Sequence, residues 1–107
     1  MRRPLVEILY FDGCPNHERA LELVERIAAE LRMQPTTEMV HVADADAATH
    51  LRFLGSPTVR VDGRDLEPDA ERRDDYALAC RVYRSDSGAA GQPADGLIRE
   101  ALLAAAG

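Results

Sequence analysis

The sequence predicts an α/β protein with a mixed four-stranded sheet and helices on both faces, in the order β-α-β-α-β-β-α. Short apolar runs alternate with amphipathic helical patterns, and this alternation requires parallel strands joined by right-handed crossovers. An Asp-Gly turn at 62–63 then indicates that the last two strands run antiparallel. The 107 residues fit a single domain, 1–107.

The first strand and the first helix have the clearest patterns. Residues 5–11 (Leu-Val-Glu-Ile-Leu-Tyr-Phe) are almost continuously apolar, which is typical of a strand buried on both faces. A helix is expected from Pro15, whose missing N–H suits a first turn, to about Met33, because Pro35 cannot continue it. Its apolar face recurs at steps of three and four, at Ala20, Leu23, Val24, Ile27, Ala28 and Leu31.

The middle of the chain predicts a second strand over 36–43 and a short helix over 45–54. Asp44 is suited to cap this helix, because its short polar side chain can accept a hydrogen bond from an exposed N–H of the first turn. Gly55 is expected to end the helix, since glycine readily takes the left-handed backbone conformation found there.

The second half of the chain adds a third strand over 57–61, a fourth over 79–84 and a last helix from Pro93 or Ala94 to Ala106. The charged stretch 64–75 is long for a hairpin connection, so we expect an exposed loop or a short helical excursion. Residues 85–92 are polar and rich in glycine.

Composition excludes several classes of function. The chain has 13 basic and 19 acidic residues, a net charge of −6, and every basic residue is arginine. A lysine nucleophile or Schiff base is therefore impossible, and the acidic balance without a basic cluster argues against a nucleic-acid partner. No apolar run is long enough to span a membrane, and the N-terminus does not resemble a signal peptide, so we expect a cytoplasmic protein. The oligomeric state is not indicated.

Cys14 is the first candidate for chemistry, within Asp12-Gly13-Cys14-Pro15-Asn16-His17. It falls between a buried strand and a helix N-terminus, where exposed N–H groups and the helix dipole favour a thiolate. His17, one turn on, could donate a hydrogen bond or add positive charge, and Asp12 is a turn residue or a proton acceptor. The plainer interpretation of Cys14 is a buried, inert cysteine.

Cys80 is the only other cysteine. A static disulfide with Cys14 is not expected in a reducing cytoplasm. If the fourth strand runs antiparallel to the third, Cys80 lies toward the far end of the sheet, roughly 10 Å or more from the Cys14 sulfur, whereas a disulfide needs Cα atoms within about 7 Å. We therefore expect Cys80 in the core, with a functional partnership with Cys14 as the alternative. Zinc could use Cys14, His17, Cys80 and another histidine, but no paired ligand spacing supports it.

Gly55-Ser56-Pro57-Thr58 is the second informative motif. The third strand should run antiparallel to the first, so its beginning lies beside the end of the first strand, where Cys14 is. Pro57 would then face the thiol. The alternative is an ordinary proline at the start of a strand, where a missing N–H is tolerated.

The element order and three segments carry a family resemblance. Residues 10–16 (Tyr-Phe-Asp-Gly-Cys-Pro-Asn), 51–65 and 80–84 (Cys-Arg-Val-Tyr-Arg) resemble the thioredoxin-fold superfamily, most closely a group of small bacterial members often labelled alkylmercury lyase. The likeness covers nearly the whole chain. It implies a cis Pro57 packed against the Cys14 sulfur and a Ser56 that offers backbone hydrogen bonds to a bound thiol or peptide. Ser56, Pro57 and Thr58 are the substrate-binding residues this implies.

His17 stands where thioredoxins carry a second cysteine, so dithiol chemistry inside the motif is impossible. What remains is one-cysteine chemistry: a mixed disulfide with glutathione or a protein, a sulfenic acid, or soft-metal binding. The predicted function is thiol–disulfide or glutathione-linked redox chemistry at Cys14, with a thiol or disulfide substrate and no cofactor.

Two other functions stay open. The first is binding of mercury or copper through Cys14 with His17 or Cys80. A related alternative is an organomercurial-lyase-like activity that uses Cys14 and Cys80, with Asp12 as proton carrier, although we expect the extra N-terminal domain of such lyases to be missing. The second is a scaffold whose active site has decayed. His41 and His50 are interpreted as surface or packing residues rather than ligands.

Overall fold

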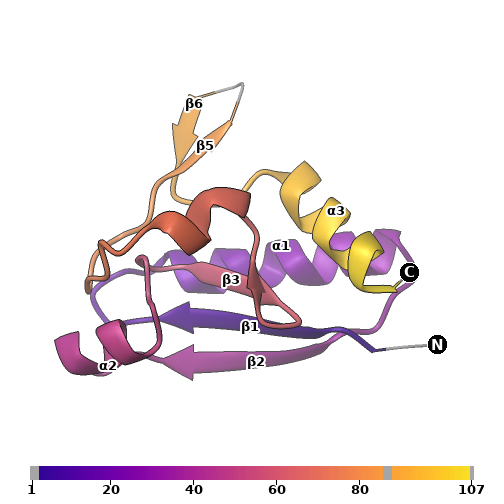
Figure 1. The fold of residues 1–107 in the computed structure, drawn as a ribbon. Helices are drawn as coiled ribbons and strands as arrows, with labels where there is room; N and C mark the ends of the chain where they lie inside the picture. Colours follow the sequence, from indigo (N-terminus) through magenta and orange to yellow (C-terminus); the bar gives the residue numbers. More distant parts are fainter. Residues whose placement is uncertain (1–2, 86–87, 107) are drawn as a thin grey trace.

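The computed structural model describes residues 3–85 and 88–106, which contain a four-stranded mixed sheet, three α-helices and a separate hairpin (Figure 1). The strand order is β2-β1-β3-β4. The central strand β1 pairs in parallel with β2 and antiparallel with β3, which in turn pairs antiparallel with β4. The bounds are β1 (Leu5–Tyr10), β2 (Thr36–His41), β3 (Thr58–Val61) and β4 (Arg64–Asp65).

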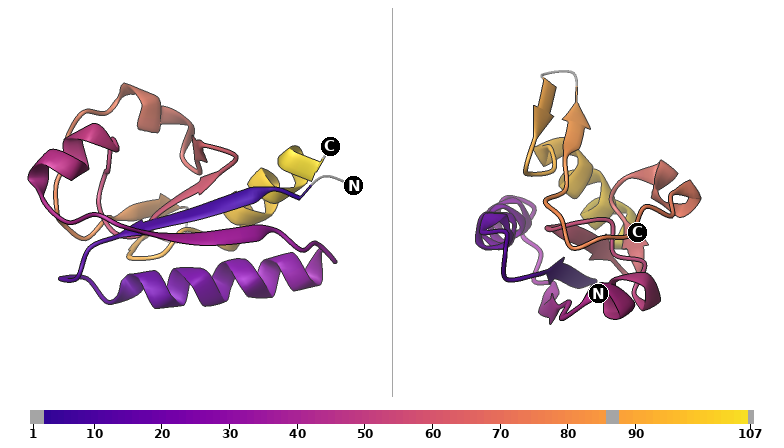
Figure 2. Two further views of the ribbon diagram at one scale, coloured as in Figure 1. Left: turned by 90° about the horizontal axis from the view of Figure 1, so that it is seen from below. Right: turned by 90° about the vertical axis from the view of Figure 1, so that its left-hand side faces the viewer.

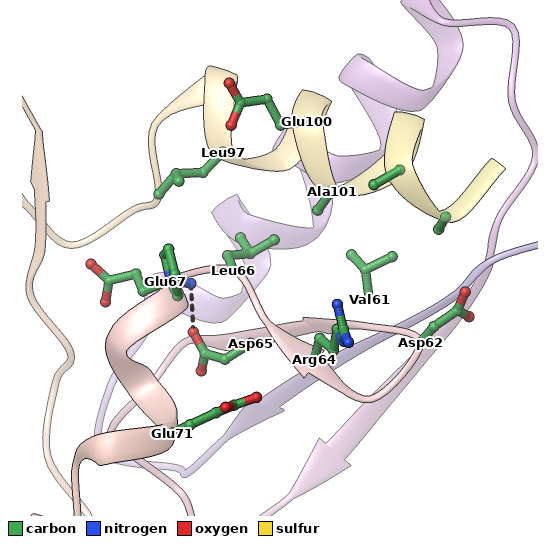
Figure 3. A pocket seen from close by; sticks show the side chains of 13 residues that line it. Val61, Asp62, Arg64, Asp65, Leu66, Glu67, Glu71, Leu97, Glu100 and Ala101 are labelled. Atoms are coloured by element: carbon green, nitrogen blue, oxygen red, sulfur yellow. Dashed lines mark hydrogen bonds between the residues drawn. The ribbon is translucent and has the colours of Figure 1, made fainter. Parts of the chain in front are cut away.

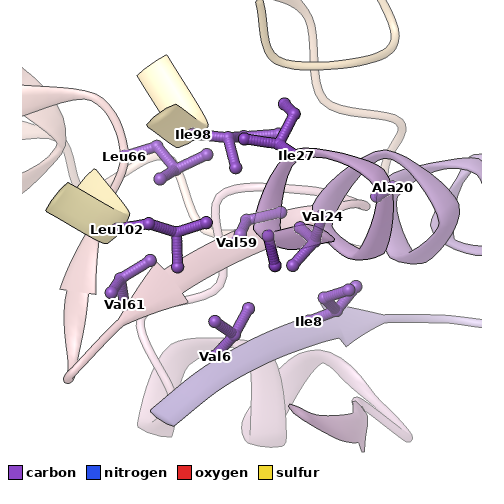
Figure 4. Close-up of a cluster of buried hydrophobic side chains, with 11 residues drawn as sticks. Val6, Ile8, Ala20, Val24, Ile27, Val59, Val61, Leu66, Ile98 and Leu102 are labelled. Atoms are coloured by element: carbon purple, nitrogen blue, oxygen red, sulfur yellow. The ribbon is translucent and has the colours of Figure 1, made fainter. Parts of the chain in front are cut away.

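One face of the sheet is covered by α1 (Asn16–Glu30) and α3 (Asp95–Ala106). Alternate residues of β1 point to this face, so Val6 and Ile8 are both buried against the two helices (Figure 4). The helical residues predicted to be apolar supply the other half of this core, with Ala20, Val24, Ile27, Ala28, Ile98 and Leu102.

The opposite face carries the short helix α2 (Ala45–His50). Leu9, which points away from Ile8, packs there with Val42, Ala48 and Phe53. The predicted cap is confirmed, because the Asp44 side chain accepts a hydrogen bond from the N–H of Ala47 at 2.8 Å. The prediction of helices on both faces of a mixed sheet is therefore confirmed, as Figure 2 shows from below.

The fourth strand was predicted wrongly. It is β4 (Arg64–Asp65), which follows β3 directly after the Asp62-Gly63 turn, and not residues 79–84. Because the tight turn returns the chain at once, β4 takes the edge of β3 that 79–84 was expected to occupy. The charged stretch after it includes the short 3-10 helix η1 (Pro68–Arg72), in agreement with the expected helical excursion.

Residues 79–84 instead divide between two structures. Cys80 forms an isolated parallel bridge with Ser56, just before β3. The chain then enters a separate two-stranded hairpin of β5 (Tyr83–Ser85) and β6 (Gly88–Ala90). The segment around Cys80 thus runs parallel to the chain at Ser56, just before β3, rather than antiparallel along β3.

Gly55 has a different role from the predicted one. The helix α2 ends at His50, and Arg52 takes the left-handed conformation there with φ +56°. Gly55 has φ +112°, and a Cβ on it would lie 2.9 Å from the carbonyl oxygen of Ala79 and 3.0 Å from Cβ of Arg81. Glycine at this position therefore allows the segment that carries Cys80 to approach β3.

Candidate functional site

Cys14 lies between β1 and α1, as predicted. Its N–H donates to the carbonyl of Phe11 at 3.4 Å in the turn that precedes the helix. Its side chain is fully buried, and the thiol donates to the carbonyl oxygen of Ser56 at 3.5 Å. The Ser56-Pro57 bond is cis. The predicted meeting of these two segments is therefore confirmed, but the Cys14 sulfur does not face solvent.

Cys80 lies far from its predicted position. It is exposed rather than part of the core, and its thiol lies close enough to the thiol of Cys14 for the two to interact. The expected separation at the far end of the sheet is wrong, because this segment runs parallel to the chain at Ser56 and is not the antiparallel neighbour of β3. Both cysteines are free thiols, and Cys14 is buried while Cys80 is exposed.

Ser56 connects the two cysteines through its backbone. Its N–H donates to the carbonyl of Ala79 at 2.8 Å, and its carbonyl accepts from the N–H of Arg81 at 2.9 Å. These bonds hold the chain on both sides of Cys80, while the same carbonyl accepts the Cys14 thiol. The backbone groups that Ser56 was expected to offer to an external thiol or peptide are thus used by the protein's own chain.

Pro57 and Thr58 form hydrogen bonds that hold the chain around Ser56 in place. The Pro57 carbonyl accepts from the Tyr83 hydroxyl at 2.6 Å. The Thr58 hydroxyl donates to the Gly55 carbonyl at 2.6 Å and accepts from Nη1 of Arg81 at 3.2 Å. Both residues are buried, so they hold the loop in place and present no open surface to a substrate.

The neighbouring Cys14 affects the pKa of the Cys80 thiol. The hydrogen bond with Cys14 raises the pKa of the Cys80 thiol, and partial desolvation and a negative charge on Cys14 act in the same direction. The exposed thiol therefore keeps its proton at pH values where a free cysteine begins to ionise.

His17 does not contact the sulfur. Its Nδ1 lies 3.0 Å from the carbonyl oxygen of Cys14, and its ring stacks on Tyr10 with centroids 4.3 Å apart. Among the described residues no hydrogen bond joins His17 to the Cys14 sulfur, so the expected stabilisation of a thiolate by His17 stays a prediction. His17 fixes the backbone at the start of α1.

Asp12 is engaged away from the thiols. Its carboxylate is largely exposed and lies 3.2 Å from Nε2 of His41, whose ring is next to Tyr10. This pair was not expected, because Asp12 and His41 come from the ends of two strands whose parallel register the sequence does not encode. His41 and His50 are both exposed, in line with their predicted surface positions.

Arg81 is the residue that sequence reasoning missed. Its side chain is completely buried and pairs with the carboxylates of Asp65 and Glu67. The only sequence signal is an arginine inside the otherwise apolar run Ala-Leu-Ala-Cys-Arg-Val-Tyr, which requires acidic partners if that run is buried.

The two large cavities lie away from the thiols. One, of about 810 Å³, is enclosed by β4, η1 and α3 (Figure 3), and its lining includes Leu66, Glu71, Leu97 and Glu100. The other, of about 1350 Å³, lies between α1, the end of α3 and residues 3–4. Neither of these two cavities is lined by a cysteine, so neither belongs to the site of the two thiols.

The described residues contain no group of three or more His, Cys, Asp or Glu side chains arranged to hold a metal ion, so the zinc set considered above has no structural support. Within the same residues, no helix is long and apolar enough to cross a membrane. The chain matches no protein-family model and no curated protein, and its candidate function therefore rests on the geometry of the Cys14–Cys80 pair.

Proposed function

We propose that this protein is a thioredoxin-like protein that exchanges thiols and disulfides through Cys14 and Cys80. The observation that carries the proposal is that both cysteines meet at Ser56: its carbonyl oxygen lies 3.5 Å from the buried Cys14 sulfur, and its backbone forms a parallel bridge with the exposed Cys80. Two thiols in contact can form a disulfide with little movement of the backbone. The proposal replaces chemistry at Cys14 alone, since a fully buried sulfur cannot be the first to meet a partner.

The exchange takes place in two steps. The Cys80 thiolate attacks one sulfur of a partner disulfide, and the other partner sulfur leaves as a thiolate that takes up a proton. The Cys14 thiolate then attacks the Cys80 sulfur of the mixed disulfide and expels the second partner thiol. Two electrons pass from the protein dithiol to the partner, which leaves as two thiols, and the protein holds a Cys14–Cys80 disulfide.

The dithiol is restored by the same chemistry in reverse. Two molecules of a small thiol such as glutathione reduce the Cys14–Cys80 disulfide and leave as one oxidised glutathione. We place the protein in the cytoplasm, where this thiol pool would hold the pair in the reduced form.

The surroundings of Cys80 favour a polypeptide over glutathione as the partner. Leu78 is 37% and Val82 52% exposed, so apolar side chains flank the thiol on both sides. Within residues 3–85 and 88–106, the backbone N–H and carbonyl of Cys80 have no hydrogen-bond partner, because Ser56 bonds with the residues before and after it. An extended peptide can pair with such an edge, and glutathione is too short to use it fully.

The proposal is tested by equilibrating the protein with mixtures of reduced and oxidised glutathione. After trapping with an alkylating agent in denaturant, mass spectrometry counts the free thiols and the bound glutathione. We expect an intramolecular disulfide in the wild type, and in Cys14→Ala a mixed disulfide between Cys80 and glutathione. A wild type that shows only mixed disulfides, or no oxidation, contradicts the proposal.

A second candidate function is the binding of a soft metal ion as cargo. The same contact supplies two thiol ligands, which suit Hg(II) or Cu(I). Titration with Hg(II), comparing the wild type with Cys80→Ala, separates the cases, and equal affinities would exclude two-thiolate binding. A lyase-like reaction also needs a proton carrier, and the expected one, Asp12, is paired with His41.

A further inference from the structure

We propose that Arg81 is a positioning residue of the thiol pair: its buried guanidinium fixes the segment that carries Cys80, so that the Cys80 thiol stays on Cys14. The inference rests on the proposed function and names the residue that sets how readily the Cys14–Cys80 disulfide forms. Arg81 is next to Cys80 in the chain, and its side chain points the opposite way, into the protein.

The two terminal nitrogens of the guanidinium are held by directional contacts, whereas its buried Nε has no hydrogen-bond partner among the described residues. Its Nη1 and Nη2 lie 2.7 and 2.8 Å from the two oxygens of Asp65, which is a bidentate pair. Nη2 also donates to Glu67 at 2.8 Å, and Nη1 donates to the Thr58 hydroxyl at 3.2 Å. Because a planar fork meets these oxygens in one orientation only, the contacts fix the position of the Arg81 backbone as well as its charge.

Tyr83 fixes the same segment two residues later. Its ring lies under the guanidinium, with the Arg81 Cζ 4.5 Å from the ring centroid, and its hydroxyl donates to the Pro57 carbonyl at 2.6 Å. The side chains of Arg81 and Tyr83 are buried, whereas Cys80, which precedes them, and Val82, which lies between them, are exposed. The chain is thus anchored on its inner face and presents its thiol on the outer face.

Burial of this ion pair specifies a geometry rather than adding much stability. Burial is the largest single effect and opposes the charge of Arg81, but the hydrogen bonds and charges of Asp65, Tyr83 and Glu67 together outweigh it, so the pKa of Arg81 lies above its ordinary value. Buried ion pairs contribute little net stability compared with apolar residues of similar size, and their best-supported use is to select one arrangement. Here the arrangement selected is the path of residues 79–83 over Ser56.

Arg81 acts on the thiols through position and not through its charge. The pKa of Cys80 is raised by Cys14 and by desolvation, and Arg81 is not among the causes. A lysine at 81 keeps the positive charge but lacks the planar fork. It should therefore fail to restore the thiol geometry, whereas an effect of charge would be restored.

The test is the equilibrium constant for forming the Cys14–Cys80 disulfide with glutathione, which measures how well the fold holds the two sulfurs together. It is measured for the wild type, Arg81→Met, Arg81→Lys and Arg26→Met, each well below its melting temperature. Arg26 is the matched control, since it pairs with Glu30 and Asp95 between two helices and does not contact the site. We expect a loss of about tenfold for Arg81→Met, a loss of at least about threefold for Arg81→Lys, and a change within about twofold for Arg26→Met.

Two further outcomes keep the inference falsifiable. If Arg81→Met does not fold, Arg81→Lys and Tyr83→Phe decide the question, and Tyr83→Phe should lose about two- to threefold because only the bond to the Pro57 carbonyl is removed. Equilibrium constants equal to that of Arg26→Met would overturn the role of Arg81 and leave the proposed function intact. A wild type that forms no intramolecular disulfide would remove the proposed function itself.

Discussion

The buried Cys14 and the exposed Cys80 are distant in the sequence but meet at Ser56, which lies in hydrogen-bond contact with the Cys14 thiol and forms a backbone bridge with Cys80. The carbonyl of Ser56 makes this contact possible, since it accepts the Cys14 thiol and also the N–H that follows Cys80. One peptide unit thus determines where both sulfurs lie. The predictions below concern the protonation, access and support of this pair.

Replacement of Cys14 by alanine should make Cys80 react faster. The hydrogen bond with Cys14 raises the pKa of Cys80, so its removal lowers that pKa and increases the thiolate fraction near pH 8. We expect a rise of about three- to tenfold in the rate of alkylation by iodoacetamide at pH 8. A rate–pH profile that does not move toward lower pH in Cys14→Ala would contradict the raised pKa.

The two cysteines of the native protein should differ sharply in access. Cys14 is fully buried and Cys80 is exposed, so one thiol reacts in the folded protein and the second only after unfolding. Peptide mapping after brief alkylation with and without denaturant checks this order. The matched variants Cys80→Ala and Cys14→Ala should show a protected and an accessible thiol respectively, and rapid native labelling of Cys14 would exclude the buried position.

Gly55→Ala should destabilise the protein and loosen the Cys80 segment. The position has φ +112°, and a Cβ would lie 2.9 Å from the Ala79 carbonyl, so backbone strain and a steric clash combine. We expect a loss of about 1–3 kcal/mol in the free energy of unfolding by urea. Gly63→Ala is the control, because it has φ +83° with nothing within 4 Å, and strain alone predicts about 1 kcal/mol. Equal losses would show that the approach of residues 79–81 is not tight.

Glu30 should make stability depend on pH in the acid range. Hydrogen bonds from Arg99 and then Arg26 lower the pKa of Glu30 below its ordinary value of 4.5. Its contribution is therefore present above pH 4.5 and is lost as the pH falls through the lower folded-state value. Wild type and Glu30→Gln should differ more in melting temperature at pH 7 than at pH 3, by a small amount because the group is exposed. A constant difference would show that the pairs do not shift this carboxyl.

Asp12→Asn should leave disulfide exchange almost unchanged. The carboxylate faces His41 at 3.2 Å and is mostly in solvent, so it does not act as a proton acceptor for Cys14. We expect the rate of disulfide formation to stay within about twofold of wild type, the variation typical of surface substitutions. A loss of tenfold or more would restore the proton-acceptor role first considered for Asp12.

Local patterns in the sequence predicted most of the sheet. The apolar run of β1, the helical spacing of α1 and the cap at Asp44 each follow from residues that are neighbours in the chain. The prediction failed where a long-range path decided the outcome. The Asp62-Gly63 turn did indicate a strand directly after β3, but β4 is only two charged residues long, and the apolar run at 79–84 looked like the better candidate.

The site was predicted in part for the same reason. The neighbourhood of Cys14 and Ser56 follows from antiparallel pairing of β1 and β3, which the order of elements implies. The exposure of Cys80 and the burial of Arg81 depend on which side of one extended segment faces inward. If this segment were shifted by one residue, Cys80 would point into the protein and Arg81 would point to solvent. The residues on either side of the segment do not determine which of the two arrangements forms.

The unequal burial of the two sulfurs also bears on oxidative damage. If peroxide converts the Cys80 thiol to a sulfenic acid, the neighbouring Cys14 thiol can condense with it at once, which forms the disulfide and releases water. Sulfinic and sulfonic acids, which thiols of the cell do not reduce, then have little time to form. A shielded sulfur beneath an accessible one would thus turn an irreversible injury into a reversible one.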